Sequence, residues 1–221
     1  MINPDTSLPK MIGIGAGGHC RVMLEIVRLM DRWQVVGLLD RESSRVGKMV
    51  DGIPIVGEDA MAATLNAQGV RTAFIGIGSV GDSTTREKAH AFLIALGFGF
   101  PVIAHPFSSI ASSTSIASGT CVMPGAIINP GTRIGLCAII NSGAIIEHDC
   151  EIGDFAHIAP RAVLGGSVTV GPRAHIGIGA VVRPGIRIGE NAMIGAGAVV
   201  VKDVEAGATV FGVPAATRIP V

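Results

Sequence analysis

One short acidic segment of the sequence carries a histidine that could act as a general base. His148 lies between Glu147 and Asp149, in a stretch that is otherwise rich in aliphatic residues. An imidazole titrates near neutral pH, so it can accept a proton from a reacting group, and a neighbouring carboxylate makes it a better acceptor. A surface histidine and a metal ligand are the alternatives. We favour the base and expect no metal, because the histidines lack the spacing of a metal site.

A second candidate site is the glycine-rich segment near the start of the chain. Gly13, Gly15 and Gly18 form the pattern GxGxxG, and Asp40 ends the next expected strand. Between a strand and a helix, such glycines let backbone N–H groups approach a phosphate, and the later carboxylate commonly meets a ribose hydroxyl. His19 either contacts the ligand or caps the helix, and we favour the ligand. A purely structural turn and a nicotinamide site are the alternatives.

The elements around this loop predict an α/β domain. We expect strands at 11–14, 34–40, 52–57, 72–78 and 100–104, and helices at 21–31, 59–68 and 83–96. Strands that alternate with helices indicate a parallel sheet, here Rossmann-like with four or five strands. No second nucleotide-binding half follows it. A mononucleotide or nucleotide sugar therefore fits this domain, assigned to 1–106, better than a dinucleotide.

The rest of the chain repeats with a period of six residues. An aliphatic residue returns at every sixth position from Ile110 to Val200, and a small residue lies two positions before most of them. Neither a helix nor an ordinary strand has this period, which is typical of the hexapeptide repeat of a parallel β-helix. Three hexads should form one coil, so His157 and His175, which are three hexads apart, should stack. We assign this domain to 107–221 and expect the glycines that often follow the aliphatic residue to supply conformational freedom at corners.

Composition and charge exclude several classes of partner. Lys and Arg total 17, as do Asp and Glu, so neither a nucleic acid nor a membrane surface is favoured. We see no signal peptide or membrane span, and expect a cytoplasmic protein with four reduced cysteines.

Three segments in order give a family resemblance: GIGAGGHCRVMLEIV, IIEHDCEIGDFAHIAP and VVVKDVEAGATVFGVPA. With them the chain resembles the bacterial sugar acetyltransferases of the left-handed β-helix (hexapeptide-repeat) superfamily. Members include sialic acid O-acetyltransferase-like proteins and N-acetyltransferases of nucleotide-linked 4-amino-4,6-dideoxy sugars. The resemblance implies a left-handed β-helix, a homotrimer, acetyl-CoA bound in the groove between subunits, and the sugar's nucleotide on the N-terminal domain.

The resemblance also assigns roles to individual residues. It implies that His148 is the general base and Asp149 its acidic partner, and it places the nucleotide sugar against Gly17, Gly18, His19, Asp40, Arg41 and Gly78. It places acetyl-CoA against His157, Gly166, Ile178 and Ala196. The ending GVPAK of the family appears here as GVPAA, which leaves Arg218 as a candidate partner for a CoA phosphate.

The reaction we expect is direct acetyl transfer from acetyl-CoA to the 4-amino group of a UDP- or GDP-linked amino sugar, with a main-chain N–H stabilising the oxyanion. O-acetylation of sialic acid or another glycan sugar is the alternative within the same class. An NAD-dependent enzyme and a non-enzymatic scaffold are the alternatives from other classes.

Overall fold

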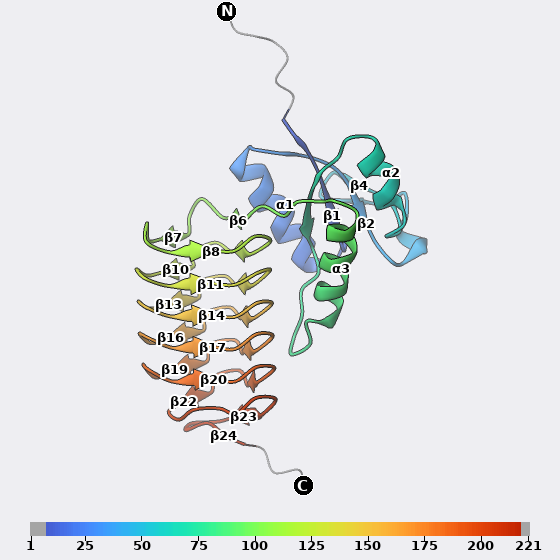
Figure 1. Cartoon of the computed structure of the whole chain (residues 1–221). Coiled ribbons are helices and arrows are strands. Elements are labelled where there is room, and N and C mark those ends of the chain that lie inside the picture. The colour runs from blue at the N-terminus through green and yellow to red at the C-terminus, as the bar shows by residue number, and fades with distance from the viewer. Residues whose placement is uncertain (1–7, 218–221) are drawn as a thin grey trace, which may run out of the picture. The chain divides into compact units, whose positions relative to one another are not determined.

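Figure 1 shows the computed structural model of the chain, which describes residues 8–217. Its contacts divide the chain into two compact units. The first runs to Gly78 and includes Thr85–Pro101, and the second contains Ser79–Thr84 and continues from Val102. The two units are described separately below. The domain boundary expected at residue 106 stays a prediction.

The first unit is a five-stranded sheet with helices. Along the chain its elements are β1 (Lys10–Ile14), α1 (Gly18–Met30), β2 (Gln34–Leu39), the short 3-10 helix Ser43–Arg45, β3 (Met49–Val50), β4 (Ile53–Gly57), α2 (Met61–Ala67), β5 (Thr72–Ile75) and α3 (Thr84–Ala95). The strand order is β3-β4-β2-β1-β5. Strands β4, β2, β1 and β5 are parallel. The carboxyl ends of β1, β2, β4 and β5 therefore meet at one edge of the sheet.

Two details of this unit differ from the expectation. Strand β3 pairs antiparallel with β4, so the sheet is mixed rather than purely parallel. The strand expected at 100–104 was wrong as a member of this sheet, because β6 (Ile103–Ala104) pairs with β9 of the second unit. Gly99, which precedes this segment, forms an isolated parallel bridge with Thr72 of the first sheet.

Helix α1 is amphipathic and begins directly at the glycine loop. Its buried residues are Cys20, Met23, Leu24, Ile26 and Val27, which recur at helical spacing. Asp31 ends the helix in a left-handed conformation, with φ of 49°. The packed side of the helix fixes its first turn at the end of β1.

The second unit is the β-helix, whose strands stack in three faces (Figure 1). The pairs within each face are parallel, except that β24 pairs antiparallel with β23. The six-stranded face contains β7 (Ser109–Ile110), β10 (Ile127–Ile128), β13 (Ile145–Ile146), β16 (Val163–Leu164), β19 (Val181–Val182) and β22 (Val199–Val200). The five-stranded face contains β8 (Ser115–Ile116), β11 (Arg133–Ile134), β14 (Glu151–Ile152), β17 (Thr169–Val170) and β20 (Arg187–Ile188). The eight-stranded face contains β6, β9 (Cys121–Val122), β12 (Ile139–Ile140), β15 (His157–Ile158), β18 (His175–Ile176), β21 (Met193–Ile194), β23 (Thr209–Phe211) and β24 (Ala216–Thr217).

The interior of this unit confirms the repeat. Ile127 pairs with Ile145, and Arg133 pairs with Glu151, so one coil takes three hexads. The aliphatic row and the small row both point inward, where residues such as Ile146, Cys150 and Ala144 are fully buried. One large and one small side chain per strand fill the narrow core.

The glycines that follow the aliphatic residue serve another purpose than expected. Gly153 has no left-handed backbone, but a Cβ there would lie 2.4 Å from the backbone nitrogen of Pro172 in the next coil. Close stacking of coils requires this glycine, so the expectation of conformational freedom was wrong. The left-handed residue of the corner comes two positions later, as at Phe155 with φ of 57°.

The outward rows of the six-stranded and five-stranded faces differ in polarity. On the six-stranded face, the outward row begins with Ser109 and continues with aliphatic residues: Ile127, Ile145, Val163, Val181 and Val199. The five-stranded face instead carries outward residues that are charged or hydroxylated: Ser115, Arg133, Glu151, Thr169 and Arg187. Two faces of one prism thus present different chemistry.

Candidate active site

The glycine loop joins β1 to α1 in the first unit, and its glycines divide into two groups. Gly15 has φ of +88°, and a Cβ there would lie 2.5 Å from Cγ1 of Ile77. A Cβ at Gly13 would lie 2.4 Å from the ring of Phe74. These two glycines are therefore required by packing. A Cβ at Gly17 or Gly18 would meet nothing within 4 Å, so both face open space at the start of α1.

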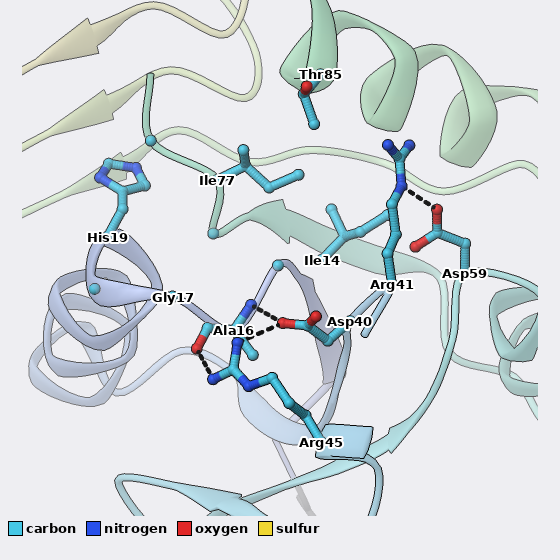
Figure 2. A pocket seen from close by; sticks show the side chains of 14 residues that line it. Ile14, Ala16, Gly17, His19, Asp40, Arg41, Arg45, Asp59, Ile77 and Thr85 are labelled. Atoms are coloured by element: carbon cyan, nitrogen blue, oxygen red, sulfur yellow. Dashed lines mark hydrogen bonds and ion pairs between the residues drawn. The ribbon is translucent and has the colours of Figure 1, made fainter. Parts of the chain in front are cut away.

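That open space belongs to a cavity of about 500 Å³ at the carboxyl edge of the sheet (Figure 2). The residues that line it are Ile14, Gly15, Ala16, Gly17, Gly18, His19, Asp40, Arg41, Arg45, Asp59, Gly76, Ile77, Gly78 and Thr85. All six residues that the resemblance assigned to the nucleotide sugar are among them. The fold thus brings Gly78 beside the glycine loop, where its Cβ would lie 3.2 Å from Cβ of His19.

The loop is held from below by Asp40 and Arg45 (Figure 2). Oδ2 of Asp40 accepts a hydrogen bond from the backbone N–H of Ala16 at 3.1 Å and one from Nη1 of Arg45 at 2.9 Å. Nη2 of Arg45 donates to the carbonyl of Ala16 at 2.7 Å. Both backbone groups of Ala16 are therefore fixed. Sequence reasoning missed Arg45, because no motif marks it.

A second ion pair lies one strand further along the sheet edge. Arg41 follows β2 and donates from Nε to Oδ2 of Asp59, which follows β4, at 3.0 Å. Since the strand order is β1, β2, β4 from the glycine loop outward, this pair lies on the far side of Asp40 from the loop. A ligand whose phosphate lies at the loop would extend toward Arg41 and Asp59.

Burial at the mouth of the loop keeps His19 neutral. Desolvation, together with the positive charge of Arg86, lowers the pKa of His19 to about 4. A neutral imidazole has one donor nitrogen and one acceptor nitrogen at physiological pH. His19 can therefore hydrogen-bond a ligand without carrying a charge.

In the second unit, His148 and Asp149 occupy a corner between the six-stranded and five-stranded faces. Nδ1 of His148 lies 2.9 Å from Oδ2 of Asp149. A carboxylate only accepts, so Nδ1 carries the hydrogen and Nε2 carries the lone pair. Asp149 takes a left-handed backbone with φ of 58°, and both side chains are exposed, His148 to 60%. The pair presents a basic nitrogen at the surface.

The four residues assigned to acetyl-CoA do not come together in one chain. Gly166 lies at the same corner as His148, one coil later, after β16. Ile178 and Ala196 follow β18 and β21, so they lie at the next corner, between the eight-stranded and six-stranded faces. Ile178 is exposed to 60%. The width of the six-stranded face separates the two corners.

His157 is buried, and its ring is bonded within the second unit. Nδ1 donates to the carbonyl of Ser79 at 2.8 Å, and Nε2 lies 3.0 Å from Nδ2 of Asn141. Oδ1 of Asn141 accepts from the N–H of Ser142, so the amide nitrogen faces Nε2 and donates to it. His157 pairs with His175 of the next coil, which confirms that the two residues lie one above the other. Their rings meet edge to face, with centroids 4.8 Å apart.

Three further expectations concern Arg218, a metal site and a membrane span. Arg218 lies outside the described residues. Among residues 8–217, no group of three or more His, Cys, Asp or Glu side chains could hold a metal ion. Within the same range, no helix is both long and apolar enough to cross a membrane.

Comparisons with known proteins cover both units. Residues 10–93 match the family described as PglD N-terminal domain, and residues 167–202 match the bacterial transferase hexapeptide repeat. Perosamine N-acetyltransferase from Caulobacter crescentus, solved with CoA and GDP-perosamine, is 36% identical, with a TM-score of 0.91 over 97% of this chain and 99% of that one. The chain belongs to the hexapeptide-repeat sugar acetyltransferases.

Two further solved structures are similar to this chain over nearly its whole length. The acetyltransferase domain of PglB from Neisseria gonorrhoeae is 31% identical, with a TM-score of 0.86 over 95% of this chain and 99% of that one. WeeI from Acinetobacter baumannii is 26% identical, with a TM-score of 0.81 over 95% and 100%. No match to a curated protein sequence was found. The chain is an acetyltransferase with a Rossmann-like unit and a left-handed β-helix.

Proposed function

We propose that this enzyme transfers the acetyl group of acetyl-CoA to the 4-amino group of a nucleotide-linked amino-dideoxy sugar. The observation that carries the proposal is the whole-length likeness to an N-acetyltransferase solved with CoA and GDP-perosamine. A hydroxyl acceptor, as in sialic acid O-acetylation, lacks this support. A dinucleotide enzyme lacks it as well, because the described first unit has one short sheet and one glycine loop.

The cavity of the first unit is the proposed nucleotide site. Gly17 and Gly18 leave room at the start of α1, where backbone N–H groups and the helix dipole favour a phosphate. Neutral His19 and Gly78 border the same space. Asp40 and Arg41 follow β2 and would meet the ribose and base.

The proposed chemistry uses His148 as the base. The sugar amine attacks the thioester carbonyl, and Nε2 of His148 takes a proton from the attacking nitrogen. A main-chain N–H of the coil stabilises the oxyanion of the tetrahedral intermediate. When the C–S bond breaks, the CoA thiolate leaves and accepts the proton from His148. Asp149 keeps the hydrogen on Nδ1, so Nε2 stays available as the acceptor.

We also propose that the enzyme is a homotrimer with acetyl-CoA bound between subunits. The six-stranded face presents an outward apolar row in which Ile127 and Val181 are 37% and 41% exposed. Contact with a second copy would cover this row. In one chain, His148 and Gly166 lie at a different corner from Ile178 and Ala196. Contact between two copies would also allow the first pair of one subunit to face the second pair of another. His157 would then support the cofactor side of the groove.

A cytoplasmic location of the enzyme stays a prediction.

The test is a panel of UDP- and GDP-linked amino sugars, incubated with acetyl-CoA and the enzyme and read by mass spectrometry. A product one acetyl group heavier, formed from an amino sugar but not from its hydroxyl counterpart, supports the proposal. The same panel with sialic acid and with NADH tests the alternatives. Acetylation of the hydroxyl sugars alone would replace the amino acceptor with an alcohol.

A further inference from the structure

Gly166 lies under the imidazole of His148, one coil further along the β-helix. A Cβ at Gly166 would lie 2.6 Å from Nε2 of His148, 2.7 Å from Cε1 and 3.2 Å from Cδ2. Non-bonded carbon contacts are comfortable only near 3.5–4 Å, so about 1 Å of movement would be needed. The ring of His148 therefore occupies space that any side chain at Gly166 would claim.

The backbone does not explain the glycine. Gly166 has no left-handed φ, so an L-residue could take its conformation. The same position in the other coils of this corner, one coil apart each time, is filled by Ser112, Pro130, His148 and Pro184. These residues all carry a Cβ, so the corner accepts one. The adjacent Gly165 is different, because a Cβ there would lie 2.6 Å from the backbone nitrogen of Pro184.

A Cβ at Gly166 would lie nearest to Nε2 of His148, the atom that is proposed to accept the proton. Nδ1 of His148 is tied to Asp149, whereas Nε2 carries the lone pair and has the shortest distance to the virtual Cβ. A side chain at Gly166 would therefore turn the ring about its Nδ1 contact and displace Nε2 most. A misplacement of about 1 Å in a reacting group can cost roughly 100-fold in rate.

We propose that Gly166 is a positioning residue that sets the location of Nε2 of His148 by having no side chain. The proposal rests on His148 being the base of the proposed function. It goes beyond a backbone contact with acetyl-CoA, because it assigns the missing Cβ of Gly166 to the base rather than to the cofactor.

The decisive experiment is a double-mutant cycle of Gly166→Ala and His148→Ala in the full chain. For Gly166→Ala we expect kcat to fall by roughly 10- to 100-fold, with unchanged melting temperature and unchanged CoA affinity by calorimetry. In the His148→Ala background the same change should have no further effect on residual turnover. A crystal structure of Gly166→Ala should show the imidazole displaced.

Each other outcome overturns the proposal. Weaker CoA binding with normal kcat would make Gly166 a cofactor contact only, and loss of folding would make it a structural glycine. Equal losses in both backgrounds would separate Gly166 from His148. If His148→Ala itself kept full turnover, the proposed base would be wrong, whereas an inactive His148→Ala beside a fully active Gly166→Ala would refute only the positioning role.

Discussion

Arg45 and Asp40 form a partly buried ion pair, with Nη1 of Arg45 at 2.9 Å from Oδ2 of Asp40, directly beneath the glycine loop (Figure 2). Asp40 was expected to meet a ribose. Its carboxylate also accepts the N–H of Glu42 on Oδ1 at 3.0 Å, so both oxygens are engaged within the chain. Asp40 thus shapes the loop, whatever else it contacts.

Asp40→Asn should destabilise the first unit by about 1–3 kcal/mol. Donors face both oxygens of Asp40, so one of them would meet the amide N–H₂ of asparagine. Urea unfolding of the variant measures the loss. The control is Glu25→Gln, which breaks the exposed Glu25–Arg28 pair and should cost at most about 1 kcal/mol. Equal effects of the two substitutions would contradict the structural role of Asp40.

His148→Ala should lower turnover by roughly 10²- to 10⁴-fold, the usual contribution of a general base. The side chain is 60% exposed, so stability and CoA affinity should change little. Steady-state kinetics and calorimetry on one preparation measure both quantities. Turnover close to that of the unchanged enzyme would remove His148 from the mechanism.

The two groups of glycines in the loop should respond differently to alanine. Gly18→Ala should fold normally and weaken nucleotide-sugar binding by roughly tenfold or more, because the new methyl group enters the cavity. Gly13→Ala should instead lower the melting temperature, since its methyl group would meet Phe74 at 2.4 Å. Differential scanning calorimetry with and without the nucleotide sugar separates these effects. A destabilised Gly18→Ala would show that the glycine serves the fold.

His19 should make the first unit sensitive to acid. Its pKa is lowered to about 4 in the folded chain, against about 6.5 when unfolded, so the unfolded state binds more protons between these values. The contribution of neutral His19 to the free energy of unfolding is fully present above about pH 6.5. It is lost as the pH falls toward 4, by up to roughly 3 kcal/mol. Urea unfolding at pH 7 and pH 5 measures it. His19→Gln should flatten this part of the pH dependence, and an unchanged slope in the variant would exclude His19 as its source.

A charge on the six-stranded face should weaken the proposed trimer. Val181→Glu would place a carboxylate in the apolar row that a second copy is proposed to cover, and should raise the dissociation constant by roughly tenfold or more. Sedimentation velocity gives the oligomeric state. Arg187→Glu on the polar five-stranded face is the matched control and should leave assembly unchanged. Loss of assembly in the control alone would move the interface to the other face.

The period of the repeat made much of the β-helix predictable. A strict interval of six residues determines which side chains point inward, and three hexads per coil determine that His157 faces His175. The same arithmetic places Gly166 next to His148, since the two are three hexads apart. That signal was present in the sequence, but Gly166 was instead assigned to the cofactor.

Contacts without a period were harder to predict. Strand β3 has two residues, too few for an alternating pattern, although Asp51-Gly52 is a strong hairpin signal. Nothing in the spacing of Arg45 reveals that its guanidinium reaches back along the chain to the carbonyl of Ala16. The strand expected at 100–104 was assigned to the wrong unit, because a short apolar segment can extend either the sheet of the first unit or a coil of the β-helix.

The three-hexad coil also limits how this enzyme can change in length. An insertion of one full coil returns every later residue to its own face, so the apolar row and the polar row each stay continuous. An insertion of a single hexad would keep every inward aliphatic residue inward while moving each later outward residue to a neighbouring face. Arg187 would then move to the eight-stranded face, into the outward row of His175 and Met193, and an insertion between His148 and Gly166 would take Gly166 away from the corner of His148. A single-hexad indel would therefore preserve the core and destroy the surface, so lineages of this enzyme should differ in length by whole coils.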